Sequence, residues 1–412
     1  MSENVQAQKS PYRWVVLSVM FFTTFVGCYA QYQIPPLAYK LIPELNLTPT
    51  QYASILTAPM IPPIFLSIFA GSMADKFGVK KVVAFSLVFV IIGTMFRYMA
   101  TNYWQMLILM MMAGLSCAFL NANVSKLLGA WFPPEEISKA MGIYLVGATA
   151  AMFVGTATTA LFPTMKSAFI TAGIFAVINA FLWLILIKDK PEGAPDMPAM
   201  PVTEYLGVAA KSKNVWLVAV IMMFSMGAMI AFSGFLPNAL HEVRGIDPVQ
   251  AGLLASIGTL GGLFGSLLGP IICDRIGYMK PFLVSVAVVG AALTYYAWQS
   301  PLGVIMWVLF LLQGFAGAAG GPLYMSFPAL LPEIGPMYAG SAGGIIGTLQ
   351  VVGAVCIPTF IITPIAGQNY YLLFALGALC FLCVAVVALF LPELGPKAMA
   401  KARGVEQSTA AV

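Results

Sequence analysis

The chain has 412 residues, of which 60% are hydrophobic and only 8% are charged. Soluble domains carry about 25% charged residues, so this composition excludes a water-soluble globular protein and indicates a chain that lies mostly in lipid. The formal net charge of +5 would also suit a nucleic-acid partner, but the positions of the basic residues, described below, explain it without one.

Long apolar stretches follow one another along the chain. A helix needs about 20 mostly apolar residues to cross a bilayer, and the stretches do not alternate as barrel strands do. The first, which begins at Trp14, is too long for a signal-peptide core. The sequence therefore predicts an all-α membrane protein with twelve transmembrane helices, near residues 13–34, 50–71, 80–100, 103–130, 136–160, 166–188, 214–238, 248–272, 280–299, 302–330, 338–364 and 369–391.

One long polar segment, residues 188–213, interrupts this series and divides the helices six and six. The segment is rich in proline and has no apolar core of its own, which is typical of a linker. We therefore expect an N-terminal six-helix bundle over 1–187, a linker over 188–213, and a C-terminal bundle with a short tail over 214–412.

The lysines and arginines indicate the orientation, because short cytoplasmic loops are enriched in them. With the N-terminus in the cytoplasm, the outer side holds only Lys40, Arg97, Lys166 and Arg244. The other sixteen of the twenty Lys and Arg lie on or near the cytoplasmic side. The pattern predicts a multi-pass protein of the plasma (bacterial inner) membrane, with both termini and the linker in the cytoplasm.

The six cysteines lie in or beside apolar runs. Cys380 and Cys383 form a C-x-x-C pattern, but their flanks are so apolar that we interpret them as packing residues. The sequence predicts no disulfide framework, no metal site and no cofactor. No nucleophile with a neighbouring base occurs in the spans, so the sequence does not predict an enzyme.

The two halves carry similar loops. "MADKFGVKK" lies between the second and third expected spans, and "ICDRIGYMK" lies between the eighth and ninth. Gly114 and Gly314 also match, at an offset that differs by one residue from that of the loops. The loops align Asp75 with Asp274, Lys76 with Arg275, Gly78 with Gly277, and Lys81 with Lys280. The pattern predicts two copies of one six-helix unit, an arrangement that transporters use for alternating access.

The stretch "GSMADKFGVKK" closely resembles the loop signature of the major facilitator superfamily, which lies between helices two and three, and "AWFPPEEISKAMGI" is similar to the family after helix four. Among its members the chain resembles the bacterial small-anion porters. The resemblance implies that Asp75 holds the two halves together when the cytoplasmic gate is shut. The implied gating set is Gly71, Asp75, Lys76, Gly78, Lys80, Lys81, Asp274, Arg275 and Gly277; the alternative is that these charges only set topology.

The spans lack the groups that usually carry protons. No Asp or Glu lies near the centre of an expected span, and the single histidine, His241, falls in an outer loop. Proton-coupled transporters commonly use a buried carboxylate or histidine. The arginine that family members with drug-antiport motifs carry before the helix-four glycine is Met110 here. These features disfavour proton-driven export of cations.

Two cations do fall within expected spans. We expect Arg97, near the outer end of helix three, to extend its head group to the interface. Lys126 follows Asn121 and Asn123 in "FLNANVSKLLGAWF", and two interpretations stay open. Either these polar groups line the cavity and bind a small anion, or Lys126 reaches the cytoplasmic boundary beside Trp131.

Further polar residues lie on helices one, ten and eleven. The resemblance implies that helices one, four, seven and ten line the cavity, although hydrogen bonds between helices are an equal alternative for each residue. The candidate substrate-binding residues are Lys126, Asn123, Asn121, Tyr32, Gln33, Gln313, Tyr324 and Gln350.

We therefore expect a secondary active transporter that works by alternating access and moves a small organic or inorganic anion by exchange or symport. Its expected partners are that small-molecule substrate and the lipid bilayer, and we expect a functional monomer. The alternatives are an exporter of a hydrophobic or cationic compound and a sensor that kept the transporter fold.

Overall fold

The computed structural model describes residues 10–191, 209–331 and 333–397. Every regular element in these ranges is helical, and eleven of the helices are long and apolar enough to cross a membrane. Large apolar side chains such as Phe65, Trp104 and Phe181 are about two-thirds exposed, as expected of surfaces that face lipid. The prediction of an all-α membrane protein is confirmed.

The chain divides into two compact units. One comprises 1–200 with 237–256, and the other comprises 201–236 with 257–412. Most of the expected linker, residues 192–208, lies outside the described residues.

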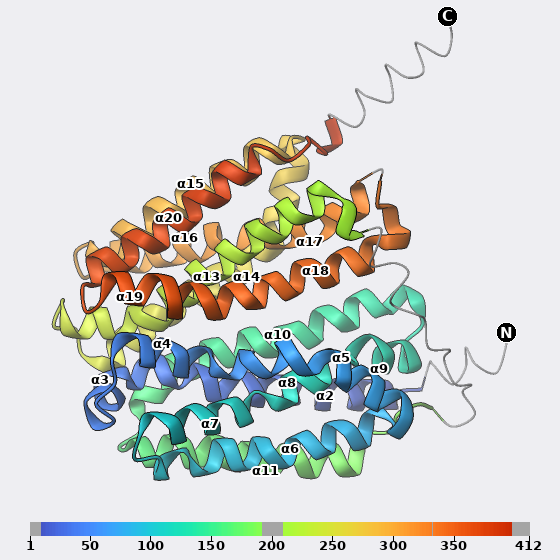
Figure 1. The fold of residues 1–412 in the computed structure, drawn as a ribbon, viewed down its shortest axis with the longest axis horizontal. Helices are drawn as coiled ribbons and strands as arrows, with labels where there is room; N and C mark the ends of the chain where they lie inside the picture. The colour runs from blue at the N-terminus through green and yellow to red at the C-terminus, as the bar shows by residue number, and fades with distance from the viewer. Residues whose placement is uncertain (1–9, 192–208, 332, 398–412) are drawn as a thin grey trace, which may run out of the picture. The chain divides into compact units, whose positions relative to one another are not determined.

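The elements up to the end of the described part of the first half follow in this order (Figure 1): α2 (Tyr12–Tyr32), α3 (Ile34–Glu44), α4 (Pro49–Thr57), η1 (Ala58–Met60), α5 (Ile61–Phe77), α6 (Val79–Met95), η2 (Phe96–Met99), α7 (Tyr103–Ala113), α8 (Leu115–Asn121), α9 (Val124–Trp131), α10 (Pro134–Thr158), η3 (Thr159–Leu161) and α11 (Met165–Leu186). The remaining elements are α13 (Lys213–Glu242), α14 (Pro248–Ile276), α15 (Met279–Tyr296), η4 (Ala297–Gln299), α16 (Val304–Ala319), α17 (Gly321–Leu330), α18 (Gly335–Cys356), η5 (Ile357–Ile362), α19 (Thr363–Ala366) and α20 (Tyr370–Ala388).

The second expected span is among those that do not form a single long helix. It is divided into α4, the 3₁₀ turn η1 and α5. Pro59 lies in η1, and Pro62 and Pro63 begin α5. Proline removes a backbone N–H and clashes with the preceding turn, so it interrupts a helix. The prolines therefore account for the division of this span.

The same helix pairs form in both units. In the first, α6 packs beside α11, and in the second, α15 packs beside α20; Figure 1 shows both pairs. These are the third and sixth spans of each half. The buried core of the first unit includes Trp183 and Phe132, and that of the second includes Phe327 and Leu283. The repeat expected from the loops is thus present in the packing.

Matched glycines make a second repeated contact. A Cβ built on Gly114 would lie 2.0 Å from the Pro59 carbonyl oxygen, and one built on Gly314 would lie 1.8 Å from the Gly258 carbonyl oxygen. In each unit, therefore, the fourth span touches the backbone of the second at a point where no side chain fits. This contact explains why glycine stands at both matched positions.

The matched loops also have a common geometry. Gly78 and Gly277 have positive φ angles, +87° and +83°, a conformation that glycine adopts without steric cost. In each half, an acid that follows the last span accepts hydrogen bonds from backbone N–H groups at the start of the helix that follows the glycine turn. Asp189 Oδ1 accepts a hydrogen bond from Lys80 N at 2.6 Å, and Glu393 accepts from Met279 N and Lys280 N at 2.7 and 3.0 Å. The negative charges also suit the positive end of the helix dipole.

Candidate functional site

The fourth span is broken where its polar residues lie. α8 ends at Asn121 and α9 begins at Val124. Non-helical backbone at membrane depth is tolerated only where it is buried in protein or lines a water-filled cavity. The buried Asn123 side chain supplies hydrogen-bond donors to backbone carbonyl groups near the break. Its Nδ2 donates to the carbonyl oxygens of Phe119 at 2.9 Å and Ala70 at 3.2 Å.

The other polar residues of this break lie on its opposite face. Asn121 and Ser125 are exposed and Lys126 is partly exposed, whereas Asn123 and Leu127 are buried. Tyr144 of α10 donates a hydrogen bond from its hydroxyl to Asn121 Oδ1. We call Asn121, Ser125, Lys126 and Tyr144 the α8–α9 polar face. A face of this composition is costly against lipid and suits a water-filled cavity.

The surroundings of Trp131 bear on the interpretation that Lys126 reaches the cytoplasmic boundary beside this tryptophan. Its indole is buried, donates from Nε1 to Lys188 O at 2.9 Å, and packs with its centroid 5.6 Å from the Tyr12 ring. Trp131 is therefore part of the packed end of the first unit and not an exposed interfacial residue for Lys126 to join.

The expectation for Arg97 is wrong. Its side chain is only 1% exposed, so the head group does not reach an interface. Arg97 Nη2 donates to Gln33 Oε1 at 2.8 Å, and Nη1 donates to Ala30 O at 2.7 Å. The guanidinium carbon lies 4.4 Å from the centre of the Phe169 ring. These partners inside the unit take the place of the water that would solvate the head group at a membrane interface.

Both the oxygen and the nitrogen of the Gln33 side-chain amide are hydrogen-bonded. Besides accepting from Arg97, it donates from Nε2 to Ala168 O at 2.8 Å, and it is fully buried. The neighbouring Tyr32 is also buried, and its Cβ lies 3.0 Å from a Cβ built on Gly155. The structure thus places Gln33 in a packed cluster with Arg97, whereas Tyr32 packs against Gly155 of α10.

Arg97 also contacts Met110 on the fourth span. Its Nη1 lies 3.6 Å from Met110 Sδ. A guanidinium from the third span therefore stands beside the position where the family's drug-antiport motif carries an arginine on the fourth.

The remaining candidates belong to the second unit. Gln313 on α16 is buried and donates from Nε2 to Thr294 Oγ1 at 3.4 Å, and Gln350 on α18 is partly exposed with its Nε2 3.9 Å from Met226 Sδ. Tyr324 on α17 is buried, and its hydroxyl has no hydrogen-bond partner among the described residues. A buried hydroxyl without a partner is costly, which makes Tyr324 the strongest candidate of the three.

The loop residues of the signature are described only in part. Gly71 lies on α5 with no heavy atom within 4 Å of a built Cβ. Lys76, Lys81, Asp274 and Arg275 are exposed and Lys80 is partly buried. Asp75 lies near the end of α5, and its side chain is outside the described part of the structure.

Sequence reasoning missed Tyr144 and misplaced Arg97. Tyr144 lies in "GIYLVGATAA", where one tyrosine among apolar residues gives no signal of a partner. A signal did exist for Arg97, because both it and Gln33 were expected near the outer end of their spans, and polar groups at one depth tend to pair. Within the described residues, no group of three or more His, Cys, Asp or Glu is placed to hold a metal.

Comparison with known proteins adds three findings. The model of the Major Facilitator Superfamily matches residues 19–358. A probable nitrate transporter, NarT, of Staphylococcus epidermidis is 23% identical over 88% of this chain and 92% of its own. A probable sulfoacetate transporter, SauU, of Cupriavidus necator is 25% identical over 83% of this chain and 84% of its own.

Among solved structures, a bacterial homologue of the human lysosomal transporter Spinster, in an inward-facing and unoccupied conformation, matches with a TM-score of 0.71 and 15% identity. The match covers 92% of this chain and 95% of that one. At this identity the likeness shows the fold.

Proposed function

Because this chain belongs to the major facilitator superfamily, we propose that it is a secondary active transporter that moves a small organic or inorganic anion, by exchange or by symport with a protonated substrate. Two of its curated relatives are named as probable transporters. Nitrate and sulfoacetate, the compounds after which two of them are named, are small anions, which supports the substrate class.

The observation that carries the proposal is the α8–α9 polar face. It places a lysine, an asparagine and a serine at a helix break, and each has a donor that can bind an anionic oxygen. Tyr144 donates its hydroxyl to Asn121 Oδ1. In the described spans, Asp and Glu occur only at helix ends. A lysine at this helix break attracts anions and disfavours cationic cargo.

The test is a substrate screen followed by exchange. Purified full-length protein is warmed with small anions, including nitrate, sulfoacetate and monocarboxylates, because a ligand that binds the folded state raises the melting temperature. An anion that stabilises the protein is then loaded inside proteoliposomes, and we expect it to accelerate uptake of the labelled external anion. Stabilisation and uptake of hydrophobic or cationic compounds only would overturn the proposal in favour of efflux.

We also propose an orientation and a gate. Both termini and the linker 188–213 face the cytoplasm of a plasma-type membrane, the transporter works as a monomer, and the loop residues around Asp75 and Asp274 close its cytoplasmic side. The bias of Lys and Arg along the chain supports the orientation. The positive-φ turns at Gly78 and Gly277 support the gate, since they bring each loop sharply back into its next helix.

The gate predicts a result for Asp75→Asn. This change removes the charge and nearly keeps the shape, so expression should survive while closure weakens. A reporter cysteine at Gly71, where a Cβ meets no heavy atom within 4 Å, should react faster with a cytoplasmic thiol reagent in the Asp75→Asn variant than in the Gly71→Cys parent, both with the native cysteines replaced. Equal reactivity together with equal transport would mean that Asp75 has no gating role.

A further inference from the structure

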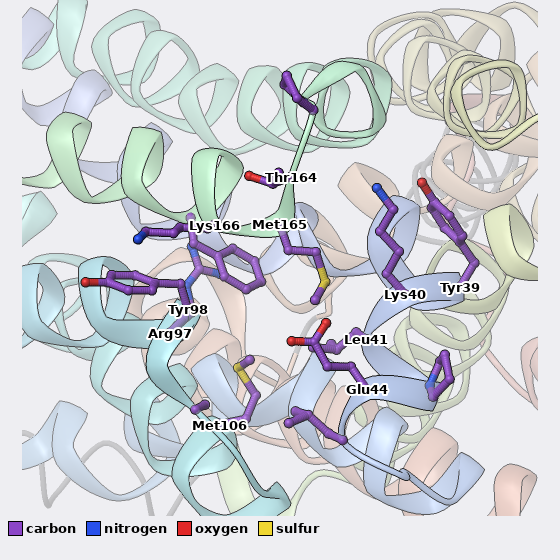
Figure 2. Close-up of a pocket in the computed structure, with 15 residues that line it drawn as sticks. Tyr39, Lys40, Leu41, Glu44, Arg97, Tyr98, Met106, Thr164, Met165 and Lys166 are labelled. Carbon is purple, nitrogen blue, oxygen red and sulfur yellow. The ribbon is translucent and has the colours of Figure 1, made fainter.

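Three of the four cations that the orientation places on the outer side meet in one pocket of the first unit. They are Lys40 from α3, Arg97 from η2 and Lys166 from α11. The pocket has a volume of about 740 Å³, which is ample for a small anion. Figure 2 shows Lys40 on one side, Arg97 and Lys166 on the other, and the Glu44 carboxylate between them.

Each of these cations rests on an aromatic ring. Lys40 Nζ lies 5.3 Å from the centre of the Tyr39 ring, Lys166 Nζ lies 5.0 Å from that of Tyr98, and the Arg97 guanidinium lies 4.4 Å from that of Phe169. Among the described residues, none of these three pocket cations has a carboxylate within 4.0 Å.

Arg97 makes the pocket more than a patch of surface lysines. Its hydrogen bonds engage four of its five N–H groups, and every acceptor is neutral: Thr94 O, Ala30 O, Gln33 Oε1 and Met110 Sδ. A guanidinium stays protonated in proteins. A charge on a residue that is only 1% exposed is costly unless it is compensated, and an anion in the pocket that Arg97 lines would lie near enough to compensate it.

We propose that this pocket binds an anionic oxygen group, such as a nitrate, carboxylate, sulfonate or phosphate, at the outer end of the first unit. That the bound group is the transported substrate rests on the proposed function, whereas an anionic lipid head group would use the same chemistry. Glu44, which lines the pocket, weakens binding by repelling the anion and thereby sets a low affinity that suits release toward the transport path.

Lysine reactivity tests the site directly. The full-length protein in phosphatidylcholine nanodiscs is treated with an amine-reactive ester at increasing sodium nitrate, with ionic strength held constant by sodium chloride, and each lysine is quantified by mass spectrometry. We expect nitrate to slow modification of Lys40 and Lys166 and to leave the exposed Lys76 and Lys81, at the opposite end of the same unit, unchanged. Equal slowing at all four lysines would mean general screening and would overturn the proposal.

Variants of the exposed Glu44 and the partly exposed Lys40 avoid unfolding as an explanation. Glu44→Gln should lower the nitrate concentration that half-protects Lys166 by about two- to fivefold, and Lys40→Gln should raise it by a similar factor, because a single charge near a surface contributes only modestly to binding. Arg97→Gln should abolish protection in whatever fraction folds. Unchanged half-protection in both the Glu44 and Lys40 variants would contradict the proposal even if wild type is protected.

A second arm separates the two sources of the anion. Nanodiscs that contain phosphatidylglycerol, without nitrate, should protect both lysines if a lipid head group is the ligand. Protection by nitrate in phosphatidylcholine alone identifies a free anion, and protection in neither arm overturns the site. Nitrate protection without uptake of any anion into proteoliposomes would instead refute the proposed function and leave the pocket standing.

Discussion

Replacing Lys126 with glutamine is expected to lower transport of the anionic substrate about tenfold to a hundredfold while the protein still folds. A charge-assisted hydrogen bond contributes roughly 1.5–3 kcal/mol, which corresponds to that change in affinity. In the proposed function the ammonium faces a partly dehydrated transport cavity, whose lower effective dielectric strengthens its attraction for an anion. The measurement is initial uptake into proteoliposomes at a fixed, subsaturating substrate concentration.

Two further variants show whether position or charge is responsible. Lys126→Arg should lose activity only in part, because a planar guanidinium keeps the charge and changes its geometry. Lys190→Gln removes the same charge from an exposed position after α11 and should transport like wild type. If Lys126→Gln is also silent with the true substrate, the reason for preferring anions is lost and the export interpretation gains.

Replacing Gly114 or Gly314 with alanine is expected to destabilise the protein by at least about 3 kcal/mol, the upper end of what overpacked sites usually cost. The added methyl would lie 2.0 Å from the Pro59 carbonyl oxygen or 1.8 Å from that of Gly258. Both obstacles are backbone atoms, which cannot turn aside as a long side chain can. The melting temperature of purified protein, followed by intrinsic fluorescence, is the measurement.

Each variant has a matched control in its own unit. Gly142 on α10 and Gly343 on α18 have no heavy atom within 4 Å of a built Cβ. Alanine there should be neutral or raise the melting temperature slightly, because it restricts the unfolded chain and favours the helix. A melting temperature for Gly114→Ala or Gly314→Ala equal to that of its control would show that the close crossing is absent in the folded protein.

Some of the site could be anticipated and some could not. The polar cluster at Asn121, Asn123 and Lys126 stands out in sequence because it interrupts an apolar run. The assignment of Asn123 to the buried side and of Asn121 to the exposed side was not predictable, because it depends on where α8 ends and α9 begins. The hydroxyl of Tyr144 that binds Asn121 comes from another helix, and no local pattern pairs the two.

The sequence by itself determined the class of fold. Hydrophobic length, the scarcity of charge and the bias of Lys and Arg are local or summed properties, and a bilayer turns them directly into spans and an expected orientation. The repeat was predictable as well, because the matching loops are local patterns that can be read along the chain. The tertiary structure decided the partners of Arg97, since depth along one helix does not say which neighbour faces it. It also decided that Lys40, Arg97 and Lys166 share one pocket, because residues far apart in the chain meet only when helices pack, and packing depends on the shapes of all the side chains between them.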